Sequence, residues 1–165
     1  MTDPCAGCGF VYDLRRAETA GDDICARAAA VVEVLRDNVI DVRCRPCPDV
    51  WSPLEYACHL RDVLLVQRER VLAARRANGA DCASMGREER AEHDGYNEQD
   101  PTDVARQLSD AAALFSNVLA RLSPEDWDRT VIYHYPETCE RPLRWVAVHT
   151  AHELRHHLRD IRGQL

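Results

Sequence analysis

Histidine and glutamate side chains near the C-terminal end of the chain offer the chemistry of metal coordination. Four of the seven histidines fall within nine residues, at His149, His152, His156 and His157. Residues four apart lie on one face of an α-helix, so both His152 with His156 and Glu153 with His157 could chelate an ion. Spacing alone does not choose between these two pairs.

The helical wheel separates the two pairs. The apolar residues of the predicted last helix mark the direction of a core, and Glu153 and His157 lie at the flank of that apolar face, about 60–120° from its centre. His152 and His156 point nearly away from the core, towards solvent. A site inside a bundle is therefore expected to use Glu153 and His157. His149 lies one turn earlier near the same flank, as an alternative ligand or a neighbour that supports the ligands.

His59 is the candidate third ligand, beside the apolar face of an earlier predicted helix. It lies seven residues after the expected N-cap Ser52, and His157 lies about five residues before the end of the last helix. If these helices are antiparallel neighbours, the two histidines meet at similar height. One carboxylate and two imidazoles leave coordination positions open, as in a reactive metal site. Asp62 and Asp160, one turn beyond each histidine, are expected to accept hydrogen bonds from ligand N–H groups.

Four predicted helices must position these side chains. The strongest start signal combines an N-cap Ser52, Pro53 in the first turn and Glu55 as the capping-box carboxylate. Asp100 and Pro101 open another helix in the same manner. The predicted helices cover about residues 20–38, 53–77, 101–122 and 142–162, and residues 131–135 are the one short extended candidate. The pattern predicts an all-α fold, a four-helix bundle.

Composition narrows the function classes. The chain has 165 residues, with 28 Asp and Glu against 21 Arg, no Lys and a net charge of −7. This balance argues against nucleic-acid binding, which needs clustered positive charge. No apolar run approaches the roughly 20 residues that cross a bilayer, and no signal peptide is evident. We expect a cytoplasmic protein with a single domain over residues 1–165, of which residues 1–18 form a Cys-containing N-terminal extension.

Two C-x-x-C pairs offer a second metal chemistry. Cys5 with Cys8 and Cys44 with Cys47 have the spacing of a tetrahedral Cys₄ zinc site. The first predicted helix, about 28 Å long, separates the pairs, so the segment before it would have to run back almost fully extended. A thiol–disulfide switch, a site completed by another chain and chance cysteine usage are the alternatives.

Two segments of the sequence resemble the DinB-like superfamily. WSPLEYACHLRDV at 51–63 carries a WS…E…H…D pattern and HELRHHLRDI at 152–161 is the His-rich last motif. The resemblance covers about residues 50–161 and implies an up-down-down-up bundle that holds a divalent metal, zinc or nickel. The ligands it implies are His59 and two members of the last motif. The mycothiol-dependent branch of the superfamily, which includes a maleylpyruvate isomerase, has Glu at the position of Glu153. Because His156 and His157 are adjacent, His156 is the alternate metal ligand to His157.

The same resemblance implies a metal-dependent thiol S-transferase or isomerase that uses a low-molecular-weight thiol such as mycothiol. A metal with an open position lowers the pKa of a bound thiol, so that the thiolate nucleophile is present at neutral pH. The expected partners are a small-molecule thiol and an electrophile, with a homodimer left open, and no catalytic residue is assigned beyond the metal site. Two alternatives are a metal-dependent hydrolase and a non-catalytic metal- or redox-responsive protein that uses its C-x-x-C pairs.

Overall fold

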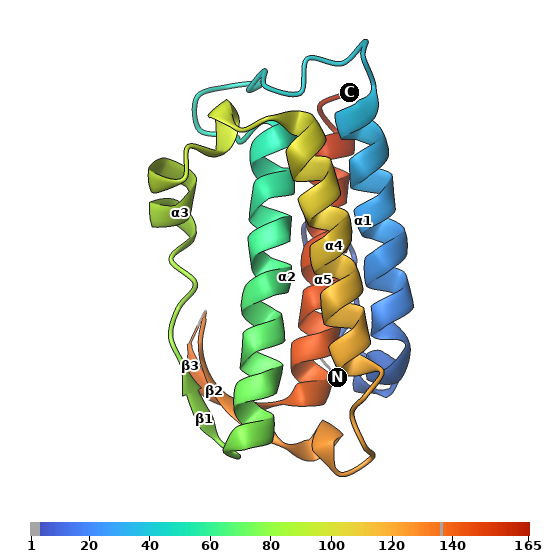
Figure 1. Ribbon diagram of the computed structural model, residues 1–165, viewed down its shortest axis with the longest axis vertical. Coiled ribbons are helices and arrows are strands. Elements are labelled where there is room, and N and C mark those ends of the chain that lie inside the picture. Colours follow the sequence, from blue (N-terminus) through green and yellow to red (C-terminus); the bar gives the residue numbers. More distant parts are fainter. Residues whose placement is uncertain (1–3, 136) are drawn as a thin grey trace.

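Four long helices lie side by side and form a bundle (Figure 1). The computed structural model describes residues 4–135 and 137–165. Helices α1 and α5 run in one direction along the bundle and α2 and α4 in the other, which is an up-down-down-up order. The long helices are α1 (Ala20–Arg36), α2 (Pro53–Arg76), α4 (Pro101–Leu119) and α5 (Leu143–Arg162). The shorter ones are η1 (Leu14–Thr19), α3 (Arg87–His93), η2 (Tyr96–Glu98) and η3 (Asp126–Asp128).

Capping residues fix where α2 and α4 begin. The Ser52 hydroxyl accepts a hydrogen bond from the Glu55 N–H at 3.2 Å, and the Glu55 carboxylate accepts one from the Ser52 N–H at 2.9 Å. Pro53 occupies the first turn, and Asp100 caps α4 through two backbone N–H groups. These bonds satisfy amides that have no partner within the helix. They thereby set the height of His59, two turns into α2.

The apolar faces of the four helices share one core. Helix α4 packs against both α1 and α2, and α5 packs against both from the other side. Leu60, Leu108, Phe115 and Leu154 are fully buried in this core. The packing makes α2 and α5 antiparallel neighbours, which is the condition for His59 to approach the histidines of α5.

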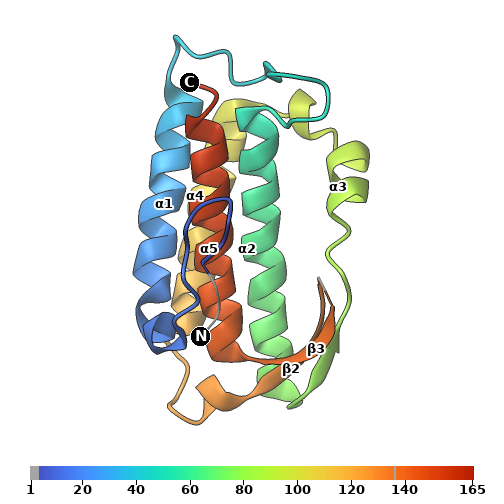
Figure 2. The same cartoon turned by 180° about the vertical axis from the view of Figure 1, so that it is seen from behind.

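A small sheet corrects the all-α prediction. Its strands are β1 (Ala80–Cys82), β2 (Thr130–His134) and β3 (Thr138–Pro142). They lie in the order β1-β2-β3, with β1 parallel to β2 and β2 antiparallel to β3. Strand β2 nearly coincides with the one extended candidate, but β1 is too short and β3 too polar to show a period of two. The sheet lies at one end of the bundle beside α2, and β3 leads directly into α5 (Figures 1 and 2).

The N-terminal segment, residues 4–13, runs along the outer face of α5 (Figure 2). It makes a tight turn in which the Gly9 N–H donates to the Cys5 carbonyl at 2.7 Å and the Cys5 N–H donates to the Phe10 carbonyl at 2.9 Å. Phe10 is buried and anchors the segment to the core. Residues 1–3 of the predicted extension lie outside the described residues. Within the described part of the chain, no helix is long and apolar enough to cross a membrane.

Candidate metal centre

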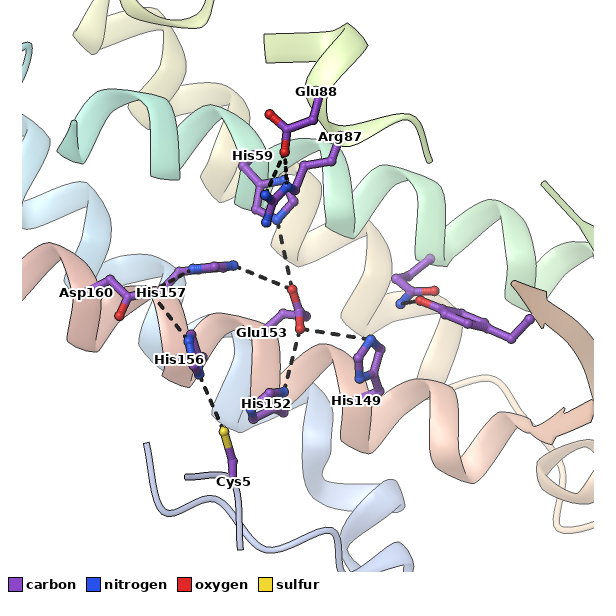
Figure 3. Close-up of polar contacts among 12 residues, drawn as sticks. Cys5, His59, Arg87, Glu88, His149, His152, Glu153, His156, His157 and Asp160 are labelled. Carbon is purple, nitrogen blue, oxygen red and sulfur yellow. Dashed lines mark hydrogen bonds and ion pairs between the residues drawn. The ribbon is translucent and has the colours of Figure 1, made fainter. Parts of the chain in front are cut away.

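His59 from α2 and Glu153 and His157 from α5 converge between the two helices (Figure 3). The Glu153 Oε2 atom lies 3.9 Å from His59 Nε2 and 3.6 Å from His157 Nε2. His59 is buried, and the side chains of His157 and Glu153 are only 12% and 20% exposed. We call these three residues the central site; they are the three that the helical wheel selected.

The spacing of these atoms fits one shared ion. Distances of 3.6 and 3.9 Å are too long for direct hydrogen bonds. Two ligand atoms at about 2.0–2.1 Å from one tetrahedral zinc lie about 3.3 Å apart, so each of these two distances would need to contract by about 0.3–0.6 Å around a shared ion. Imidazole nitrogen and carboxylate oxygen are suitable ligand types. The residues present therefore fit a divalent metal with coordination positions left over.

Asp160 orients His157 within the central site. The Asp160 Oδ2 atom lies 3.0 Å from His157 Nδ1, so this nitrogen carries the proton and Nε2 directs its lone pair towards Glu153. Burial alone would lower the pKa of His157, but Asp160 and Glu153 outweigh burial and raise it. The aspartate one turn beyond the histidine thus has the contact that the sequence predicted for it.

Asp62 lies in a different contact from the one predicted. Its carboxylate accepts hydrogen bonds from Arg61 Nε at 2.8 Å and from the Tyr96 hydroxyl at 2.6 Å. The Nδ1 atom of His59 is buried and has no hydrogen-bond partner among the described residues. Burial lowers the pKa of His59, which keeps its imidazole neutral and able to donate a lone pair.

Glu153 is held in its ionised form. Burial alone would raise its pKa, but contacts with His152, His157 and His59 outweigh burial and hold the pKa well below its ordinary value. An ionised carboxylate is the form that binds a metal. The histidines around Glu153 therefore keep it ready as a ligand at neutral pH.

The second oxygen of Glu153 faces two further histidines. Oε1 lies 3.9 Å from His149 Nε2 and 3.6 Å from His152 Nδ1. The Tyr12 hydroxyl lies 2.9 Å from Nδ1 of both rings. His149, His152 and Glu153 also lie close enough together to hold an ion. However, the Tyr12 hydroxyl already contacts the His152 nitrogen that faces Glu153. Burial lowers the pKa of His149 to about 4, so this ring is neutral and supports Glu153.

The N-terminal segment covers His152 and His156 on the outer face of α5. A helical wheel does not show such a contact, because it describes one helix only. The Phe10 ring lies 5.3 Å from the His152 ring, and Cys5 Sγ lies 3.6 Å from His156 Nδ1. The expectation that His152 and His156 face solvent is therefore wrong, because the N-terminal segment lies over them. His156 contacts Cys5 rather than Glu153, which leaves His157 as the residue of the doubled pair at the central site.

The two C-x-x-C pairs lie in different surroundings. Cys44 and Cys47 are exposed in the loop between α1 and α2, and neither joins a group of potential metal ligands among the described residues. Cys5 and Cys8 instead lie with two histidines of α5. The N-terminal segment follows α5 and does not run back past α1 to the second pair, so the structure does not assemble the predicted Cys₄ group.

An arginine that the sequence analysis did not single out lies beside the central site. Arg87 of α3 lies near His59 (Figure 3), with its guanidinium 4.9 Å from the centre of the Trp51 ring. Trp51 in turn packs against His59, with 5.3 Å between the ring centres. Glu88 pairs with Arg87 at 2.6 Å. Nothing in the charged sequence of α3 marked Arg87 out, because its position depends on how the crossover between α2 and α4 folds.

Fold and site together define a four-helix bundle with a candidate metal centre built by two of its helices. The family model of the DinB superfamily matches residues 23–161, and the chain belongs to this superfamily. A search of curated proteins found no sequence match. Among solved structures, the fold is similar to that of YfiT from Bacillus subtilis, described as a probable metal-dependent hydrolase with an unusual four-helix bundle topology. The two share 14% sequence identity at a TM-score of 0.73, over 92% of this chain and 86% of YfiT.

Proposed function

We propose that the chain is a metal-dependent enzyme whose central site holds a divalent ion, zinc or nickel, and activates a low-molecular-weight thiol such as mycothiol. The proposed reaction is S-transfer to a small electrophile or isomerisation of one. The observation that carries the proposal is the convergence of the His59 and His157 imidazoles and the ionised Glu153 carboxylate between α2 and α5. Three protein ligands leave positions for a thiol, as catalytic rather than structural sites do.

The residues around the central site hold its ligands in position. A bound divalent metal supplies a lowered pKa for a thiol or water in an open position. Asp160 holds the Nδ1 proton of His157 and thereby fixes the ring. Tyr12 holds His149 and His152 beside the second oxygen of Glu153, which keeps that carboxylate in place.

Arg87 is the residue we propose for binding an anionic substrate. Its guanidinium lies near His59 and forms an ion pair with Glu88. A substrate carboxylate could take the place of the Glu88 carboxylate in this ion pair. Two other arginines are engaged elsewhere. Arg61 is buried and bonded to Asp62, and Arg155 donates to the Cys8 carbonyl at 3.2 Å.

A second candidate function is metal-dependent hydrolysis, in which water takes the open position in place of the thiol. The observation in its favour is the description of YfiT, a structural neighbour, as a probable metal-dependent hydrolase. The two candidates differ in whether turnover requires an added thiol.

Metal analysis of single variants tests the central site. We expect His59→Ala and His157→Ala each to lose about one equivalent of metal relative to the wild-type protein, while His93→Ala, an exposed histidine of α3, loses none. Unchanged metal content in both site variants would refute the proposal. The metal-loaded protein is then assayed with electrophiles plus mycothiol, and with esters and amides without thiol; turnover only in the second assay selects the hydrolase.

A further inference from the structure

We infer a second metal site in this chain, in which Cys5, Cys8, His152 and His156 bind one zinc ion. These four side chains offer two sulfur and two nitrogen atoms that all lie within 4.8 Å of one another. C-x-x-C in a turn combined with histidines four apart on a helix is a spacing of tetrahedral zinc sites. We call this group the N-terminal site; it faces away from His59, on the other side of α5 (Figure 3).

The turn that carries the two cysteines fits closely against α5. A Cβ added to Gly7 would lie 2.5 Å from His156 Cε1, so glycine is what lets the backbone lie on the imidazole ring. Gly9 has a positive φ of 67°, which closes the turn with little strain. Arg155 donates a hydrogen bond to the Cys8 carbonyl and fastens the turn to the helix. The turn is thus shaped to bring its thiols to the two histidines.

Each histidine turns one nitrogen towards an oxygen and the other towards the place of the ion, and the His152 contact is short enough for a hydrogen bond. The Nδ1 atom of His152 lies 2.9 Å from the Tyr12 hydroxyl, and its Nε2 is buried without a hydrogen-bond partner among the described residues. The Nε2 atom of His156 lies 3.7 Å from Asp160, and its Nδ1 faces Cys5. Metal-binding histidines have this arrangement, because the oxygen fixes the tautomer and the ring orientation.

The distance between one cysteine and one histidine of the group agrees with zinc. Sulfur at about 2.3 Å and nitrogen at about 2.0–2.1 Å from one tetrahedral zinc lie about 3.6 Å apart. The distance from Cys5 Sγ to His156 Nδ1 is 3.6 Å. Two thiolates with two imidazoles form a closed set that zinc prefers and that leaves no position for substrate.

The N-terminal site therefore has a structural role that the central site does not. Zinc there would clamp the N-terminal segment onto α5 and hold Tyr12 against His149 and His152. The thiols come from outside the bundle, whereas the central site lies between α2 and α5. Either site can be lost while the other remains, so the two are separately testable.

Cobalt substitution tests the N-terminal site independently of activity, because thiolate ligands give Co²⁺ an intense charge-transfer absorption that nitrogen and oxygen ligands do not. We expect this band in the wild-type protein and in His157→Ala, which disrupts only the central site. It should be absent from the Cys5→Ser/Cys8→Ser variant. The matched control Cys44→Ser/Cys47→Ser changes the other C-x-x-C pair and should keep the band.

Zinc content gives the second readout. The wild-type protein and the Cys44→Ser/Cys47→Ser control should bind two equivalents, and Cys5→Ser/Cys8→Ser and His156→Ala one. A charge-transfer band that survives in Cys5→Ser/Cys8→Ser, or that is lost in the control, would overturn the inference. If the double variant does not fold, X-ray absorption of the zinc-loaded wild-type protein decides. Sulfur at about 2.3 Å supports the site, and a shell of nitrogen and oxygen alone overturns it.

Discussion

Removal of the Asp160 carboxylate should weaken metal binding at the central site without disturbing the bundle. Asp160 accepts the hydrogen bond from His157 Nδ1 at 3.0 Å, and its side chain is 31% exposed. In Asp160→Ala the ring loses the acceptor that fixes its tautomer and orientation. The variant keeps all three ligands of the central site, so a loss of affinity there reports the loss of the Asp160 contact with His157.

The expected loss follows from this single contact. Removal of such an acceptor behind a metal-bound histidine typically lowers metal affinity about 10–100-fold, which corresponds to about 1.4–2.7 kcal/mol. Asp160→Asn keeps an oxygen that can accept the same hydrogen bond but loses the charge, so its loss should be smaller. Because Asp160 is partly exposed, the stability of the metal-free fold should change by no more than one hydrogen bond contributes, about 0.5–1.5 kcal/mol.

Competition titration against a chromogenic chelator measures this affinity. Titrations are run in the Cys5→Ser/Cys8→Ser background, so that thiolate ligands do not contribute. The control is Asp110→Ala, an exposed aspartate of α4 that makes only a surface ion pair with Arg106. If Asp160→Ala binds metal as tightly as the control, His157 does not act as the ligand we describe.

Three further predictions concern the scaffold. Ser52→Ala should lower the free energy of unfolding by about 1–2 kcal/mol because it removes the N-cap of α2, whereas Ser84→Ala, in an exposed loop, should change it little; denaturant unfolding measures both. Leu108→Ala should cost about 2–5 kcal/mol, since Leu108 is 0% exposed, while Leu114→Ala on the same helix, at 46% exposed, should cost far less in thermal unfolding. Burial alone would raise the pKa of Glu55. Hydrogen bonds from the Arg45 guanidinium and from the Ser52 backbone N–H outweigh burial and lower this pKa. Glu55 therefore stabilises the fold above its ordinary pKa of 4.5 and loses this contribution as pH falls through the folded value. The stability gap between wild type and Glu55→Gln should narrow in acid, and a gap that is constant with pH would contradict this.

Local signals in the sequence were sufficient to predict the bundle. Ser52 and Asp100 cap the helices at the positions expected from residue type alone, because capping depends on neighbours two or three residues away. The sheet was missed because β1 spans only three residues and pairs with residues of β2 that lie 51 positions further along the chain. Pairing over such a distance leaves no periodic pattern in either segment.

The central site could be predicted because a helical wheel needs only the direction of the core. It placed Glu153 and His157 at the inner flank, where α2 brings His59 to meet them. The surroundings of His152 could not be predicted in this way. What covers the outer face of α5 is the N-terminal segment, and no spacing within either segment encodes that contact.

Anomalous diffraction from crystals of the zinc-loaded protein locates the ion that we propose for the central site. We expect a zinc peak between His59 Nε2, Glu153 Oε2 and His157 Nε2, within bonding distance of all three atoms. A structure of the loaded protein with no peak at that position would contradict this proposal.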